Sequence, residues 1–104
     1  MVFFQRPGRL AALCAALGST PLGAEVDVAV VVSGPGAGCP PDVRVIADPT
    51  GALAARFGLA APADGGPPVG YAVVDGRQRI RYRTLDPGVV QRLSEVATIL
   101  RATP

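Results

Sequence analysis

The stretch that decides the fold reads PVGYAVVDGRQRIRYRT and covers residues 68–84. Residues 69–74 are apolar and rich in β-branched side chains, which is typical of a strand. In residues 79–84 arginines alternate with apolar side chains or threonine, and this is the period of a strand with one face in water. Asp75-Gly76 predicts a tight turn between the two segments. The stretch therefore predicts an antiparallel hairpin whose outer strand carries arginines, a usual protection of an exposed edge.

Outward from this hairpin, apolar spacing predicts two more strands and three helices. Strands are expected over residues 2–4 and 26–32, with a short extended piece at 43–46, and helices over residues 9–17, 48–58 and 86–100. The last two helices begin at Asp-Pro pairs, because Asp accepts hydrogen bonds from the first amides and Pro fits the first helical position. The order β-α-β-α-β-β-α predicts an α/β fold of three layers, α/β/α, around a mixed parallel and antiparallel sheet.

Composition limits the chain to one domain, residues 1–104, and excludes several kinds of chemistry. Of the 104 residues 13 are glycine and 11 are proline, and ten arginines against eight acidic residues give a net charge of +2. So small an excess argues against a nucleic-acid reader and a binder of anionic membranes. The sequence contains neither His nor Lys, which excludes catalysis by a His base, His-ligated metals and Schiff-base chemistry. We expect no metal and no cofactor.

The location expected by default is the cytoplasm. No apolar run approaches the roughly 18 to 20 residues that a membrane span requires. Residues 1–24 imitate a secretory signal, with arginines at positions 6 and 9 ahead of the apolar segment 10–17 and small residues at 23 and 24. The apolar residues 2–4 come before those arginines, where a signal is polar, so we favour a strand, a turn and a helix for this segment.

Three segments of the chain resemble peroxiredoxins of the alkyl hydroperoxide reductase/thiol-specific antioxidant family, which have the thioredoxin fold. They are VIADPTGALAARFGL at residues 45–59, the hairpin at 71–83, and LDPG at 85–88 with the helix behind it. Pro68 stands where the thioredoxin fold has a proline, typically cis, at the active-site end of a strand. The resemblance covers most of the chain and implies that residues 2–4 form the central strand with residues 26–32 beside it. It also implies thiol-dependent peroxide reduction, with a peroxide and a thiol-redox partner.

At the catalytic position, however, the sequence departs from that family. The attacking cysteine, or a Cys-x-x-Cys pair, should follow the first strand at the start of the next helix, where the helix dipole lowers the pKa of the thiol. Residues 5–12 read QRPGRLAA and contain no thiol. We therefore expect the peroxidase activity to be weak or lost.

The two cysteines are the remaining candidates for redox chemistry. Cys14 shares the apolar stripe of Leu10, Leu13 and Leu17, so a buried structural role is favoured over a redox one. Cys39 stands in a loop with Arg44 as its nearest cation, so it is either an incidental thiol or a redox centre that has moved from the usual position. A disulfide between the two would require α-carbons within about 7 Å.

Two further motifs have an ordinary explanation beside a functional one. The glycine-rich run at residues 33–38 follows a strand, as in phosphate-binding loops, but its prolines remove amides and no helix pattern begins directly behind it. The arginines at 79, 81 and 83 could bind an anionic partner, although such a row is usually a solvated face. The alternative to a redox enzyme is a non-catalytic module that binds a partner or forms a homodimer through its sheet edge or its bare active-site end.

Overall fold

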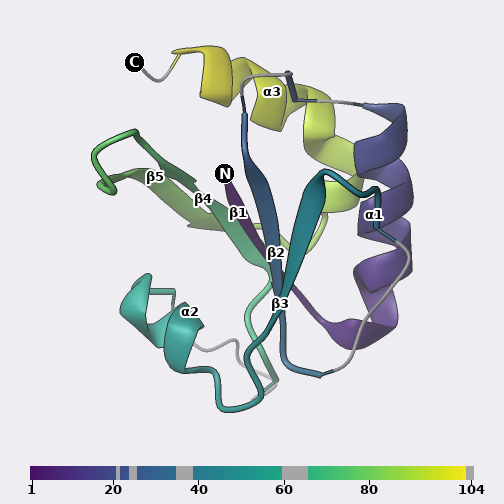
Figure 1. Cartoon of the computed structure of the whole chain (residues 1–104), viewed down its shortest axis with the longest axis vertical. Coiled ribbons are helices and arrows are strands. Elements are labelled where there is room, and N and C mark those ends of the chain that lie inside the picture. The colour runs from purple at the N-terminus through teal and green to yellow at the C-terminus, as the bar shows by residue number, and fades with distance from the viewer. Residues whose placement is uncertain (21, 24–25, 35–38, 60–65, 103–104) are drawn as a thin grey trace.

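The computed structural model describes residues 1–20, 22–23, 26–34, 39–59 and 66–102. Its strands are β1 (Val2–Gln5), β2 (Val28–Val32), β3 (Val43–Ala47), β4 (Gly70–Val74) and β5 (Ile80–Leu85). Its helices are α1 (Leu10–Ser19), α2 (Ala52–Arg56) and α3 (Leu93–Ala102), and the short 3-10 turns η1 (Pro7–Arg9) and η2 (Val89–Arg92) lead into α1 and α3. Figure 1 shows these elements as one sheet with helices on both sides.

The five strands form one mixed sheet in the order β3-β2-β1-β4-β5. β1 lies at the centre, parallel to β2 and antiparallel to β4, so that Phe3 is paired with Val30 on one side and with Tyr71 on the other. β3 extends the sheet parallel to β2, and β5 closes the opposite edge antiparallel to β4. The central place expected for the first strand is therefore confirmed.

The helices cover the two faces unequally, which gives the expected three layers (Figure 1). α1 and α3 lie on one face over the larger core, in which Phe3, Leu13 and Val96 are almost fully buried. α2 lies on the other face over a smaller core of Phe4, Val31 and Ala54. Successive residues of β1 point to opposite faces, and this is why the adjacent Phe3 and Phe4 belong to different cores.

The predicted order β-α-β-α-β-β-α is wrong by one strand. The short extended piece expected at residues 43–46 is a full edge strand, β3, hydrogen-bonded to β2 over five residue pairs. The sequence pattern understated it because Arg44 interrupts the apolar run and the glycines and prolines of residues 34–41 precede it. The observed order is β-α-β-β-α-β-β-α.

The start of α2 also differs from the expectation. Asp48-Pro49 does not begin the helix, because Gly51, at a left-handed φ of 74°, stands directly before its first residue, Ala52. The carboxylate of Asp48 still caps it from a distance, since Oδ2 accepts hydrogen bonds from the Leu53 and Ala54 amides at 3.0 and 3.4 Å. Gly58 ends the helix at φ 73°, as the sequence predicted.

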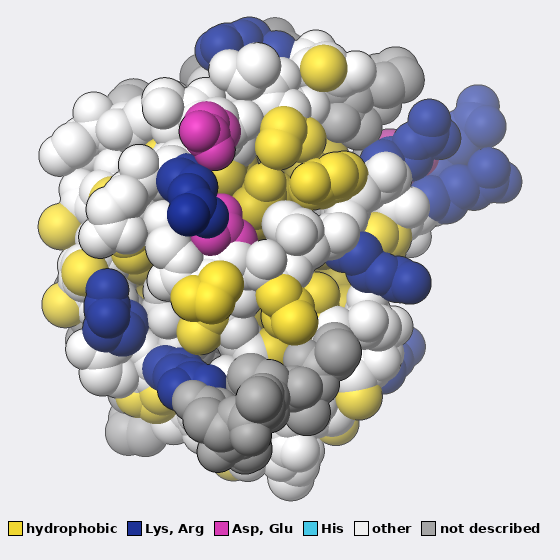
Figure 2. Space-filling model, turned by 180° about the vertical axis from the view of Figure 1, so that it is seen from behind, with side chains coloured by type: hydrophobic (Ala, Val, Ile, Leu, Met, Phe, Trp, Pro, Cys, Tyr) yellow, Lys and Arg dark blue, Asp and Glu magenta, His cyan; other side chains and the backbone are white. Residues whose placement is uncertain are grey.

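The hairpin between β4 and β5 forms as predicted, but with a longer turn. The Asp75 carboxylate accepts hydrogen bonds from the Arg77 and Arg79 amides at 2.8 and 3.0 Å, and the left-handed residue is Gln78 at φ 65° rather than Gly76. Several arginines project together from one side of the molecule, and others are spread over the same face (Figure 2). One arginine of the row is not simply solvated: Arg83 Nη1 donates to the Phe57 carbonyl at 3.2 Å and ties β5 to the end of α2.

Tyr71 makes stability depend on pH at the alkaline end. Burial raises the pKa of its phenol above the ordinary 10.0, and the nearby Tyr82 and Asp86 raise it further. Because the unfolded phenol ionises first, the stabilisation is complete below pH 10.0 and is lost as pH rises through the folded pKa. We expect the free energy of unfolding to fall more steeply above pH 10 in the wild type than in Tyr71→Phe, as measured by urea titration. Equal slopes in the two proteins would contradict this.

Candidate functional site

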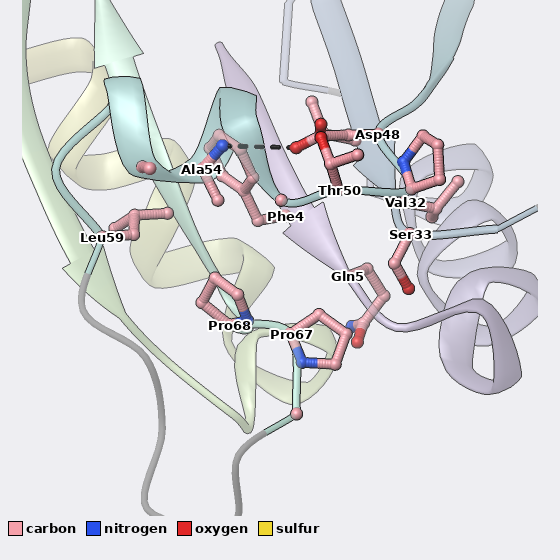
Figure 3. Close-up of a pocket in the computed structure, with 15 residues that line it drawn as sticks. Phe4, Gln5, Val32, Ser33, Asp48, Thr50, Ala54, Leu59, Pro67 and Pro68 are labelled. Atoms are coloured by element: carbon pink, nitrogen blue, oxygen red, sulfur yellow. Dashed lines mark hydrogen bonds between the residues drawn. The ribbon is translucent and has the colours of Figure 1, made fainter.

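A crevice opens beyond the carboxyl ends of β1 and β2, on the side of α2. This crevice has a volume of about 550 Å³ and is lined by Phe4, Gln5, Val31, Val32, Ser33, Asp48, Pro49, Thr50, Gly51, Ala54, Ala55, Leu59, Gly66, Pro67 and Pro68. Four separate segments contribute: the ends of β1 and β2, the connection from β3 into α2, and the approach to β4 (Figure 3). In open α/β sheets, ligands bind in just such a crevice outside the carboxyl ends of parallel strands.

The walls of the crevice are apolar and a few polar groups converge on it. Phe4, Ala54 and Leu59 form one side, and the rings of Pro67 and Pro68 stand opposite the end of β1 (Figure 3). Gln5, Ser33, Thr50 and Asp48 contribute the polar atoms. An apolar lining with a small number of placed polar groups is the usual composition of a small-molecule site.

Pro68 lies at the entrance to β4 and across from the end of β1 (Figure 3). None of the peptide bonds in the described residues is cis, so the cis form typical of that family does not occur at Pro68. The guanidinium of Arg6 crosses this end of the sheet, and its Nε donates to the Pro67 carbonyl at 3.0 Å. An arginine contact thus occupies the junction between the end of β1 and the Pro67-Pro68 segment.

The position that should carry the attacking thiol is occupied by a 3-10 turn. Pro7–Arg9 form η1, and α1 begins only at Leu10. The residue before α1, Arg9, makes no side-chain capping hydrogen bond to that helix. A thiol activated by a helix start is therefore missing here, as the sequence indicated.

The two cysteines are joined to each other in a disulfide between α1 and the segment before β3. The α-carbons of Cys14 and Cys39 are 4.6 Å apart, which satisfies the distance condition for a bridge. Cys14 is buried at 1% exposure within the larger core, and Cys39 packs half-buried against the same core. Neither cysteine lines the crevice. Cys14 is buried, as its place on the apolar stripe predicted, and Cys39 is its partner in the disulfide.

The glycine-rich run and the signal-like segment lie only partly within the described residues. Of the glycine-rich run at 33–38, residues 35–38 lie outside the described residues, and Ser33 lines the crevice. Residues 21 and 24 of the signal-like segment also lie outside them, whereas its residues 2–5 form β1 and its residues 10–19 form α1. No group of three or more potential metal ligands occurs in the part of the chain that the structure describes.

Sequence reasoning missed the polar residues of the crevice. Gln5 ends β1 and Ser33 directly follows β2, and polar residues at the carboxyl ends of neighbouring parallel strands meet at one edge of a sheet. That pattern was the available signal. Asp48 was recognised only as a helix cap, and Thr50 carried no signal at all.

Within the described residues, no helix is both long and apolar enough to cross a bilayer. The cytoplasmic location stays a prediction, and the disulfide is of a kind that persists mainly in oxidising compartments. Compared with protein-family models, with curated proteins and with solved structures, the chain matches none.

Proposed function

We propose that the chain is a thioredoxin-like domain related to peroxiredoxins that has lost thiol peroxidase chemistry and acts as a non-catalytic binding domain. The strand order supports the relationship. A central β1 with β2 parallel on one side and the antiparallel pair β4 and β5 on the other, with α1 and α3 on one face and α2 on the other, is the arrangement that the resemblance implies. β3 adds an edge strand outside β2.

The observation that carries the loss of peroxidase chemistry is the pairing of both cysteines away from the active-site end. Peroxide reduction by a thiol requires a thiolate that a nearby positive charge or helix start activates. Cys14 is buried in the core and bonded to Cys39, and the start of α1 offers η1 in place of a thiol. The fold therefore retains a crevice at its active-site end without the nucleophile.

Hydrogen peroxide tests this proposal directly. We expect the oxidised protein to keep its intact mass in stoichiometric peroxide, because neither sulfur is a thiol. After reduction with dithiothreitol and desalting, thiol loss should be no faster than that of N-acetylcysteine, since Cys14 is buried inside α1 and neither cysteine stands at a helix start. The readouts are free-thiol titration and intact mass.

The matched control for this experiment is Cys39→Ser, which leaves the buried Cys14 alone. The wild type could consume peroxide clearly faster than N-acetylcysteine and lose this activity in Cys39→Ser. That result would contradict the proposal and identify Cys39 as a displaced redox centre. Similar slow rates in both proteins support a binding domain. A homodimer through a sheet edge stays a prediction; of the two edges, β5 carries the arginines and a bulge opposite Val73 and Val74, devices that oppose edge pairing.

A further inference from the structure

A hydrogen bond from the next residue in the chain fixes the orientation of the Gln5 side-chain amide. The amide N–H of Arg6 donates to Gln5 Oε1 at 2.9 Å, and only the oxygen of a glutamine side chain can accept such a bond. The two ends of the side-chain amide are therefore assigned by chemistry, and the donor group Nε2 is the end left for other partners.

The Gln5 side chain is buried, and its Nε2 donor has no acceptor among the described residues. The residue is 3% exposed, and its side chain accepts the Arg6 bond but donates none to the described residues. No fully enclosed polar side-chain atom of the described residues lacks a partner, so Nε2 keeps its remaining access through the crevice that Gln5 lines. A donor with that access bonds water, and a ligand acceptor in the crevice can take the place of that water.

The surroundings of Nε2 define what such a ligand looks like. The hydroxyls of Ser33 and Thr50 line the same crevice and can donate or accept. Phe4, Ala54 and Pro68 provide apolar wall (Figure 3). A ligand with an apolar body and a carbonyl oxygen would satisfy both kinds of surface.

The negative charge of Asp48 decides which kind of carbonyl group the crevice favours. The Asp48 carboxylate is part of the lining, and it is held in place by the Leu53 and Ala54 amides. A ligand carboxylate would meet this like charge, whereas a cation would present no acceptor to Gln5. A neutral amide offers a carbonyl oxygen to Nε2 and N–H donors to the hydroxyl and carboxylate oxygens, so it fits the set best.

We propose that the crevice binds a small neutral ligand with an apolar body and an amide or similar carbonyl group, received by Gln5 Nε2. This inference rests on the proposed function as a binding domain and names its ligand class. The sequence places the donor at the end of β1, the most central strand, where its backbone pairs with Val32 of β2. The donor is thus presented from a rigid element rather than from a loop.

Four probes that share one ring and differ in one group test the proposal: benzamide, benzoate, benzamidine and toluene. The readout is titration of the wild-type protein followed by ¹H–¹⁵N spectra that include the Gln5 side-chain amide. We expect benzamide to bind most tightly at millimolar concentration and to shift the Gln5 side-chain signals. Toluene should bind more weakly, and benzoate least.

The decisive variant is Gln5→Glu, because it retains an oxygen for the Arg6 N–H and replaces the donor with a negatively charged acceptor. We expect benzamide affinity to fall about fivefold or more. The variant loses the hydrogen bond from Nε2 and places a carboxylate oxygen against the carbonyl oxygen of benzamide. Toluene affinity should change little. Benzamidine should gain affinity, because Q5E adds a second carboxylate to the crevice that Asp48 already lines. A variant that merely loosened the fold would weaken all four probes together.

Three results would overturn the ligand class: no probe shifting crevice residues, benzamide no better than toluene, or an unchanged benzamide-to-toluene ratio in Q5E. The outcome is separate from that of the peroxide experiment. Probe binding by a protein that also shows Cys39-dependent peroxide turnover would refute the loss of catalysis alone. An inert protein that binds no probe would refute the ligand class alone.

Discussion

Replacing Gly70 with alanine is expected to destabilise the protein by about 4 kcal/mol, more than the 1–3 kcal/mol of ordinary overpacking. Gly70 opens β4, is buried, and is paired with Phe4 on one side and Leu85 on the other. A Cβ at this position would collide with the Thr84 carbonyl oxygen and lie 2.9 Å from the Leu85 α-carbon. Both are backbone atoms, so relief requires β4 and β5 to separate rather than a side chain to turn.

The matched control is Gly76→Ala in the following turn, where a Cβ would meet nothing within 4 Å. Neither Gly70 nor Gly76 is among the glycines of positive φ, so alanine can adopt both backbone conformations and the comparison isolates the collision. Urea unfolding should show a large loss for Gly70→Ala and a change within about 0.5 kcal/mol for Gly76→Ala. Equal stabilities of the two variants would show that β4 and β5 are less closely paired than described.

The elements that sequence predicted well are those in which one periodic signal decides the outcome. The stripe of Leu10, Leu13, Cys14 and Leu17 predicted the buried face of α1, and the β-branched run of residues 26–32 predicted β2, which starts two residues later at Val28. β3 was understated because an edge strand needs only part of its side chains buried. Its Arg44 is exposed while Val43 and Val45 contact the larger core, so the apolar pattern was weak although five pairs with β2 form.

The crevice was less predictable, because it is assembled from residues far apart in the chain. Gln5, Ser33, Asp48 and Pro68 come from four segments, and only the sheet order places them together. The sequence could not decide whether the disulfide forms, for a similar reason. The spacing of Cys14 and Cys39 gives the length of the loop between them but not whether its ends lie close together. What the sequence did establish is the missing thiol after β1, since that concerns residues 5–12 alone.

Breaking the disulfide is expected to destabilise the protein by about 3.5 kcal/mol, the chain-entropy value for a loop of this length. Cys14 and Cys39 are 25 residues apart in sequence, and the loop between them contains β2. The bond joins α1 to the segment that leads into β3, and β3 otherwise pairs only with β2. For a domain of this size the loss corresponds to a fall in Tm of about 15 °C.

Urea and thermal unfolding of the wild type, with and without dithiothreitol, measure this effect. The control is the double variant Cys14→Ala/Cys39→Ala, whose stability should match that of the reduced wild type apart from the small cavity at Cys14 and should not respond to dithiothreitol. Hydrogen exchange should place the earliest loss of protection in β3, because its remaining strand pairing is with β2 alone. A wild type that loses less than about 1 kcal/mol on reduction would show that packing of β3 against β2 and the core, rather than the crosslink, holds this edge of the sheet.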